Sequence, residues 1–385
     1  MPLAGLILTD DDMLAPEALA RTLMPIAGQT LIEYQVRIAR SCGAAHIVVL
    51  VDRIPAPLEE AFERLRLDGI AFEIARTAGQ AADCIHPDEQ LLVIGSGVVA
   101  ARNIVEGLAS RPGPTLLTLK DTDAVSHFER IDNVDRWAGL ALMNGRLLRD
   151  TAAMLGDWTL GPTLLRVALQ GGVERLPADG QGLAMVRSEV DAHDVARELA
   201  ARSRFSGAGF WQSQVVDPVV RLIMPRFFGS GFSLDLVPLV PAVLMAGAMI
   251  AGALGWMAAS FGLFLIAGFP MAVAGVLSDI AARPNGVLKW TAEAKTPLLL
   301  ALLCFAGWTM NGPGFGWGPL VLGLWAGIAL ILQPRTVNRE LWLADADLIA
   351  VEVLMGTLIG QPVLGLMVAV AHSVLSQFWL VRRQS

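Results

Sequence analysis

The chain has 385 residues, of which 54% are hydrophobic and 17% charged, and its formal net charge is -7. An acidic balance provides no basic surface for nucleic acid, so we expect no nucleic-acid partner. The three cysteines, Cys42, Cys84 and Cys304, are far apart and odd in number, which excludes metal-binding spacings and argues against a disulfide framework.

The average composition conceals two different parts of the chain. Residues 1–203 mix charges with short apolar runs, as soluble domains do, whereas residues 234–385 are mostly long apolar blocks. Residues 204–233 connect the two parts. The N-terminus lacks a basic segment and reaches an acidic run at Asp10 after a short apolar stretch, so we expect a first strand there rather than a signal peptide.

Apolar runs typical of strands alternate with helical patterns through the first domain. Strands are expected at residues 3–8, 46–51, 70–74, 90–95, 115–119 and 137–143, and helices at 31–42, 58–67 and 194–203. The alternation predicts an α/β domain with a mostly parallel, Rossmann-like sheet. Ligands of such sheets bind beyond the carboxyl ends of the strands, which points to residues 9–12 and 95–98.

Residues 20–34 read ARTLMPIAGQTLIEY, and GAAHIVV follows at 43–49. This pattern resembles the start of the nucleotidyltransferases that activate sugar or polyol phosphates, in which a Gly-rich loop precedes Lys-x-Leu-x-Pro-x-x-Gly-x-Pro-Leu-Ile and a helix. The resemblance covers residues 3–200 and implies a nucleotide pocket at the strand ends. Its residues in this chain would be Asp10, Asp11, Arg21, Gly28, Ser96 and Asp191.

The chain departs from this family where catalysis would occur. Asp10 and Asp11 lie where the Gly-rich loop would receive phosphates on its backbone amides. Arg21 replaces the lysine, which keeps the charge but not the shape. Ser96 follows the strand that ends in the family's metal-binding aspartate, and a hydroxyl is a poor substitute for a carboxylate on Mg²⁺. Of two expected metal acids, one remains, as Asp191.

Two interpretations of these acids stay open. Asp10, Asp11 and Asp12 are either a replacement metal site or part of a solvated loop, which is the usual place of charge clusters. Asp191 and Asp194 either hold metal or are N-terminal acids of the helix at 194–203, which the helix dipole favours.

The connecting region contains a second helical pattern. Residues 211–228 place apolar residues beside two arginines, with aromatic residues Trp211, Phe227 and Phe228 at the ends. We expect an amphipathic helix at a membrane interface. A helix packed against another domain is the alternative.

Long apolar blocks in the second part predict six membrane spans, each close to the ~20 residues that cross a bilayer. The expected spans are 236–255, 258–278, 296–312, 317–333, 342–360 and 362–381. Lysine and arginine occur before the first span, in every second loop and after the last span. By the positive-inside rule both termini and the first domain are expected in the cytoplasm.

This order of parts resembles the bifunctional enzymes that make a CDP-polyol and pass it to a membrane alcohol phosphotransferase. The membrane part resembles the CDP-alcohol phosphatidyltransferases, whose motif Asp-x2-Asp-Gly-x2-Ala-Arg-x8-Gly-x3-Asp-x3-Asp holds two divalent metals. Ala282-Arg283 matches the motif, but its aspartates are replaced, and Asp279 lies one residue out of register, about 100° around a helix. One displaced carboxylate cannot form a two-metal site.

Other polar residues of the membrane part are weaker candidates. Lys295 beside Glu293 either binds a lipid phosphate, together with Arg283, or reaches the cytoplasmic surface. Asp345 and Glu352 are seven apart and share a helix face, and an ionisable residue at membrane depth suggests function. The weak metal candidates are therefore Asp191, Asp279, Asp345 and Glu352. We expect His372 to form hydrogen bonds within the helix bundle, and Asp347 to lie near the membrane interface in contact with water.

Three functions remain open from the sequence. The first is a non-catalytic relative of the two-domain enzyme that acts as a subunit, lipid binder or regulator in bacterial polar-lipid or sphingolipid head-group metabolism. The second is an active phospho-alcohol transferase with a rearranged Mg²⁺ or Mn²⁺ site, and the third is a lipid or solute transporter. The resemblance implies a bacterial inner-membrane protein that contacts membrane lipids, a homodimer through its membrane helices and a lipid-biosynthesis enzyme as partner.

Overall fold

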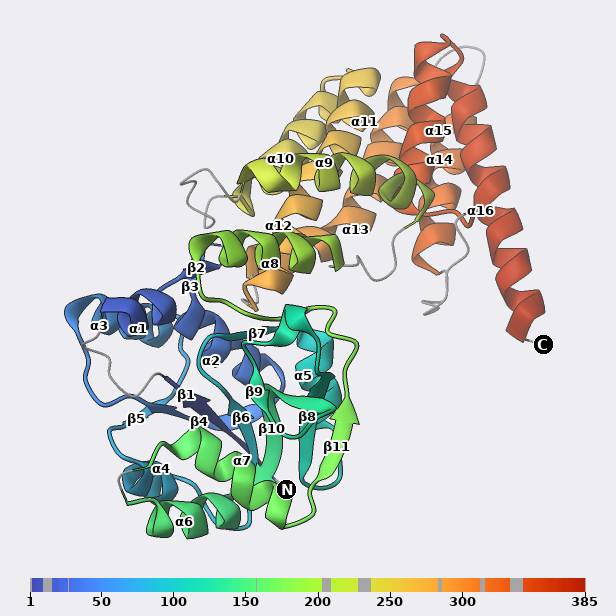
Figure 1. Ribbon diagram of the computed structural model, residues 1–385. Helices are drawn as coiled ribbons and strands as arrows, with labels where there is room; N and C mark the ends of the chain where they lie inside the picture. Colours follow the sequence, from blue (N-terminus) through green and yellow to red (C-terminus); the bar gives the residue numbers. More distant parts are fainter. Residues whose placement is uncertain are drawn as a thin grey trace. The chain divides into compact units, whose positions relative to one another are not determined.

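The computed structural model describes residues 2–9, 16–26, 28–156, 158–202, 209–227, 237–282, 286–311, 316–332 and 342–384. The chain divides into two compact units: residues 1–202 with 280–283, and the remainder of 203–385 (Figure 1). Asp10, Asp11 and Arg283 lie outside the described residues, so their predicted roles stay predictions.

The first unit is built on a mostly parallel sheet. Its strands are β1 (Leu3–Leu8), β4 (Ala44–Leu50), β5 (Glu73–Ala75), β6 (Gln90–Ile94), β8 (Thr115–Lys120), β9 (Glu129–Arg130), β10 (Asp135–Asn144) and β11 (Glu174–Pro177). Their order is β11-β8-β10-β6-β1-β4-β5, with β9 paired to β10. Strand β1 runs parallel to both of its neighbours, β4 and β6, as its continuous apolar run predicts for a strand covered on both faces. The predicted α/β class is confirmed.

Strand β10 breaks the parallel pattern. It runs antiparallel to β6 and to β8, and its register with β8 shifts between Trp137 and Ala141. Gly139 lies inside this irregularity with a φ of 74°. Such an irregularity bends a strand locally. The Gly139 carbonyl accepts a hydrogen bond from the Gly95 amide at 2.7 Å, so the bend lies at the level where β6 ends.

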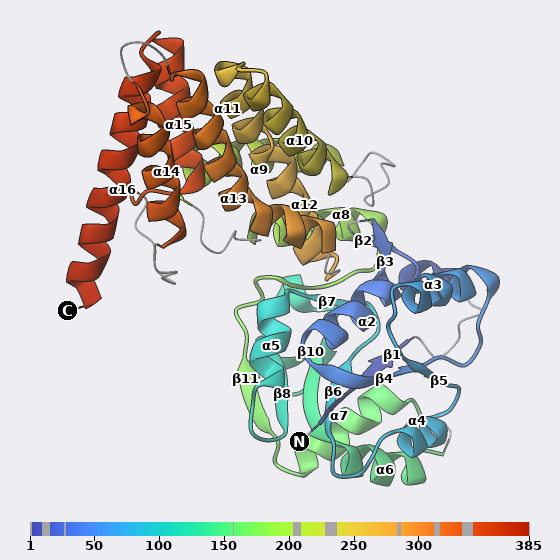
Figure 2. The same ribbon diagram turned by 180° about the vertical axis from the view of Figure 1, so that it is seen from behind.

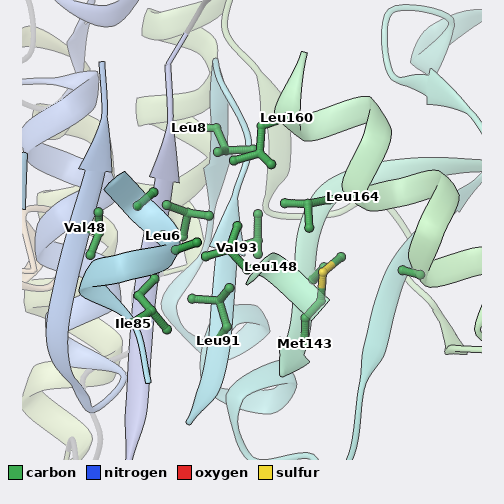
Figure 3. Close-up of a cluster of buried hydrophobic side chains, with 14 of the residues drawn as sticks. Leu6, Leu8, Val48, Ile85, Leu91, Val93, Met143, Leu148, Leu160 and Leu164 are labelled. Atoms are coloured by element: carbon green, nitrogen blue, oxygen red, sulfur yellow. The ribbon is translucent and has the colours of Figure 1, made fainter. Parts of the chain in front are cut away.

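Helices cover both faces of the sheet. The helices of the first unit are α1 (Pro16–Thr22), α2 (Leu31–Ser41), α3 (Ala56–Leu67), α4 (Ala78–Cys84), α5 (Arg102–Ala109), α6 (Gly145–Met154), α7 (Leu160–Gln170) and α8 (Glu189–Arg202). Apolar residues of α4, α6 and α7 form one core with β1, β4, β6, β8 and β10, and the three helices lie together in Figure 2. Figure 3 shows Leu160 and Leu164 of α7 against Leu8 and Val93. On the other face Gly5 approaches Ala39 of α2, since a Cβ on Gly5 would lie 3.4 Å from the Ala39 Cβ.

Two short ladders complete the unit. Strands β2 (Pro25–Ile26) and β3 (Gln29–Thr30) form a hairpin, and β7 (Val98–Ala100) pairs with β12 (Leu183–Met185). Helix α2 follows the hairpin directly. It starts with a capping box, in which the Thr30 amide donates to Glu33 Oε2 at 2.9 Å and the Glu33 amide donates to Thr30 Oγ1 at 3.4 Å.

The second unit is helical. Its helices are a π-helical turn (Gln212–Val216), α9 (Asp217–Phe227), α10 (Leu239–Ala253), α11 (Met257–Ile266), α12 (Gly268–Ile280), α13 (Gly286–Thr309), α14 (Gly318–Ile331), α15 (Ala346–Leu358) and α16 (Pro362–Gln384). Helical structure is thus present at each of the six expected spans. Apolar residues of α10, α11, α13, α14, α15 and α16 share one core, in which Leu299, Leu302 and Leu303 of α13 are fully buried.

Among the described residues, two helices are long and apolar enough to cross a membrane. They are Met257–Ile280, which combines α11 and α12, and Pro362–Arg382 of α16. The apolar helices Leu239–Ala253 and Gly318–Ile331 are shorter. Length and composition therefore support membrane crossing for two of the six predicted spans.

The helix predicted at 211–228 exists, but one of its faces is packed. Val216 and Val220 are buried, and Val216 lies beside Gly268 of α12. Trp211 packs against the helical core. Leu222 is exposed on the opposite face, so the helix is amphipathic as predicted and also packs within its own unit.

Candidate functional site

The carboxyl edge of the central strands is the place where the sheet can present a ligand site. Ile7 of β1 pairs with Ile94 of β6, so the two strands end side by side. Beyond β1, the amide and hydroxyl of Thr9 both donate to the Leu50 carbonyl, at 3.3 and 2.8 Å. Beyond β6, the chain turns through Ser96 toward β7.

Side chains of helix α2 hold this turn by hydrogen bonds to its backbone. The Gln35 Nε2 amide is buried and donates to the carbonyl oxygens of Gly95 and Val98, each at 2.9 Å. The Tyr34 hydroxyl donates to the Ala100 carbonyl at 2.7 Å. These bonds satisfy backbone oxygens at the end of β6 and along β7, and they hold Ser96 in a defined position.

Arg21 lies at the same turn. Gly97 has a φ of 75°, and a Cβ placed on it would lie 3.3 Å from Arg21 Cδ and 3.3 Å from the Val186 carbonyl oxygen. The Val186 amide in turn donates to the Gly97 carbonyl at 2.8 Å. The structure therefore brings Arg21 and the residue after Ser96 together, with the segment that leads into α8.

Asp191 belongs to the first turn of α8. Its Oδ2 accepts hydrogen bonds from the amides of Arg187 and Ser188, at 3.1 and 3.2 Å, and the Asp191 amide donates to Ser188 Oγ at 3.2 Å. This is the helix-terminal role that the sequence left open, and the helix begins at Glu189, five residues earlier than expected. The carboxylate thus accepts from the two backbone amides that immediately precede α8.

His127 is a neighbour of this helix start that the sequence did not suggest. Burial, the nearby Arg187 and, more weakly, Arg136 lower the pKa of His127, while Asp191 raises it. The net shift of the His127 pKa is downward. A histidine in a loop carries no periodic signal, and only the fold places it beside α8.

Gly28 is apart from the turn at Ser96. It belongs to the β2–β3 hairpin, where its φ of 81° suits a tight two-residue connection. Of the predicted pocket residues that the structure describes, Arg21 and Ser96 share one neighbourhood, Asp191 is linked to it through Val186, and Gly28 shapes the hairpin before α2.

A buried charge network underlies the hairpin, and no pattern in the sequence indicated it. Glu33 and Arg37 of α2 are each 2% exposed. The Glu33 carboxylate accepts hydrogen bonds from Arg64 Nε at 3.0 Å and from Arg64 Nη2 at 3.1 Å. Arg37 Nη2 lies 2.6 Å from Asp68 Oδ2 and 3.3 Å from Glu33 Oε1, and Arg37 Nη1 donates to Gln29 Oε1.

Acid should weaken the first unit through this network. Burial raises the pKa of Glu33, but hydrogen bonds from Arg64 and Thr30 outweigh it, and the net pKa lies below the ordinary 4.5. A depressed carboxyl pKa stabilises the fold above its unfolded value, and that stability is lost as pH falls through the folded value. Urea unfolding of residues 1–202 should therefore show stability falling below about pH 4.5, and Glu33→Gln should flatten that fall.

Glu129 provides a control of opposite sign. Burial raises the pKa of Glu129, with Arg166 opposing, so this group favours the fold at low pH and loses that contribution as pH rises. Glu129→Gln should steepen the acid-side loss of stability. If both substitutions change the pH slope in the same direction, the assignment of the slope to Glu33 is wrong.

The polar candidates of the second unit are distributed over several helices. Asp279 is exposed near the end of α12, and Glu293 is exposed on α13. Lys295 Nζ lies 2.7 Å from Asp347 Oδ2 of α15 in a largely buried ion pair. Lys295 is thus paired within the bundle, with a partner, Asp347, that the sequence did not predict.

Asp345 and Glu352 also have defined partners. Asp345 caps α15, accepting from the Leu348 amide at 2.7 Å. Glu352 Oε1 lies 2.6 Å from His372 Nδ1 of α16. No group of three or more His, Cys, Asp or Glu side chains suited to a metal ion occurs within the part of the chain that the structure describes. Among the described residues of the second unit, the weak metal candidates Asp279, Asp345 and Glu352 form no such group.

Comparison with known proteins adds little to this geometry. No protein-family model and no curated protein match the chain. Among solved structures it is similar to a protein given provisionally as a glucose-1-phosphate thymidylyltransferase from Bacillus anthracis, in complex with a sucrose, at 14% identity and a TM-score of 0.40. The match covers 53% of this chain and 97% of that chain. The fold of the first unit therefore rests on its own strand order and register.

Proposed function

We propose that this chain is a membrane protein of bacterial polar-lipid or sphingolipid head-group metabolism that has lost the two-step transfer reaction. It acts as a subunit, lipid binder or regulator of a lipid-biosynthesis enzyme. The observation that carries the proposal is the strand-end turn at β6. There the chain has Ser96 and Gly97 where a nucleotidyltransferase needs a metal-binding carboxylate. The Asp191 carboxylate accepts hydrogen bonds from two backbone amides at the start of α8.

The charge chemistry of this edge supports the loss of nucleotide activation. A nucleoside triphosphate reacts with its phosphates neutralised by divalent metal and by cations. Arg21 supplies one cation, but Ser96 contributes only a hydroxyl, which binds Mg²⁺ weakly in comparison with a carboxylate. The same loss is proposed independently for the membrane part, where Asp279 is out of register with the motif of the CDP-alcohol enzymes.

A membrane location is supported by the surface of the helical unit. Large apolar side chains are exposed along α10, α14 and α16, among them Val243, Val321 and Phe378, whose exposed fractions are 69%, 59% and 70%. Water-exposed apolar surface on this scale is typical of a lipid-facing helix bundle. We propose six spans in the inner membrane, with both termini cytoplasmic and contacts between copies through the membrane helices. Cysteine labelling from each side of the membrane tests the topology.

Calorimetry tests the first half of the proposal. Full-length protein in detergent, titrated with CTP and Mg²⁺, is expected to give no heat of binding at micromolar concentrations. Restoring the acid by Ser96→Asp is the informative companion, since it returns a carboxylate to the end of β6. Micromolar binding by the unaltered protein would contradict the proposed loss, whereas binding gained only by Ser96→Asp would support it.

A further inference from the structure

The His372 ring contacts two hydrogen-bond acceptors. Its Nδ1 lies 2.6 Å from Glu352 Oε1 on α15, and its Nε2 lies 2.7 Å from the backbone carbonyl oxygen of Trp342. A carbonyl oxygen only accepts, so Nε2 must carry a proton. Nδ1 and Oε1 cannot both be bare at 2.6 Å, because two lone pairs would then face each other at hydrogen-bond distance.

Counting protons fixes the charge of the pair. One proton is on Nε2, and a second lies between Nδ1 and Oε1. If that second proton is on Nδ1, the pair is an imidazolium and a carboxylate, and if it is on Oε1, the pair is a neutral imidazole and a carboxylic acid. Both forms are neutral overall, and both contain one proton more than a neutral histidine beside an ionised glutamate.

The contact between Glu352 and His372 is largely buried. The Glu352 and His372 side chains are 16% and 18% exposed, and Glu352 Oε2 is buried without a hydrogen-bond partner in the described part of the chain. Lys295 of α13 is paired with Asp347, and Asp345 caps α15. Helices α11 and α14 contain no charged residue.

We propose that Glu352 and His372 form a proton-binding site that joins α15, α16 and the segment 342–345. The bound proton completes the chain from Glu352 through the His372 ring to the Trp342 carbonyl. A second bond ties the same segment to α16, from the Ala344 amide to Ser376 Oγ at 2.9 Å. Release of the shared proton leaves two acceptors, Nδ1 and Oε1, facing each other, so the contact between α15 and α16 weakens at this point, while Nε2 still donates to the Trp342 carbonyl. This site is independent of the proposed loss of the transfer reaction.

Nitrogen NMR of the full-length protein with ¹⁵N-labelled histidine, in detergent, measures the proton count. The His372 signals are identified by their loss in His372→Asn. At neutral pH we expect either two N–H groups on the ring, or one N–H group together with a protonated Glu352 carboxyl seen by infrared spectroscopy. A singly protonated ring beside an ionised Glu352 would overturn the proposal.

Hydrogen exchange tests the joining of the helices. After correction for the intrinsic pH effect, exchange at residues 346–358 of the wild-type protein, the residues of α15, should accelerate at alkaline pH, when the proton leaves. Glu352→Gln places an amide donor against Nδ1 and should remove this acceleration. The control Glu293→Gln, an exposed acid of α13, should keep it. Equal pH dependence in the wild type and Glu352→Gln would refute the coupling.

Discussion

Arg37→Met is expected to lower the free energy of unfolding of the first unit by about 3–5 kcal/mol, because removal of one member of a buried charge network takes away the opposite charge that compensates the others. Arg37 is 2% exposed and contacts the carboxylates of Glu33 and Asp68 together with Gln29. Glu33 would keep Arg64, but Asp68 would lose both of its bonds from Arg37. Urea unfolding of residues 1–202, followed by far-UV circular dichroism, measures the change.

Arg66→Met is the matched control for this prediction. Arg66 contacts Glu59 and Glu63 with its side chain 46% exposed, so the same substitution is expected to cost about 0–1 kcal/mol. Similar losses for the two variants would show that burial of the network contributes nothing particular. They would also show that the network does not hold the hairpin and α2 in place.

Gly139→Ala is expected to destabilise the first unit by a comparable amount and to disturb the turn at Ser96. The backbone φ of 74° costs an L-residue about 1–2 kcal/mol. A Cβ at this position would also lie 2.3 Å from Val98 Cγ2, and such overpacking costs a further ~1–3 kcal/mol. Because Val98 is held by Gln35, the strain reaches the end of β6 directly.

The control for Gly139 is Gly107→Ala in α5. A Cβ on Gly107 meets no atom within 4 Å, and alanine is favoured over glycine in a helix by about 0.5–1 kcal/mol. This variant should be neutral or slightly more stable in the same urea titration. If Gly139→Ala leaves the stability unchanged, the irregularity in β10 is not tightly packed against Val98.

The sequence predicted the strands well and their direction poorly. The apolar runs of β1, β4 and β6 identify buried parallel strands, since both of their faces need covering. The run at 137–143 was equally apolar, and nothing in it says that β10 runs antiparallel to both neighbours. Direction depends on the connections that precede a strand, and the helices α4, α6 and α7 that line this core were not among those predicted.

Polar residues of α2 show a second limit. Polar residues such as Gln35 and Arg37 normally lie on a solvated helix face. Both are buried here because their hydrogen-bond partners come from distant segments, the β6–β7 turn and Asp68. Asp191 shows the opposite case. Its position near a helix start was foreseen as one of two roles, because the first turn of a helix is a local feature that short-range spacing can indicate.

Turnover measurement on the purified full-length protein tests the central claim most directly. Protein in lipid vesicles is supplied with CDP-alcohols and a phospho-alcohol with CTP, with Mg²⁺ or Mn²⁺, and products are followed by mass spectrometry. The proposed loss of the transfer reaction predicts no product above a protein-free control with either metal. Product formation that disappears in Asp279→Asn would contradict it and would establish an active transferase with a rearranged metal site.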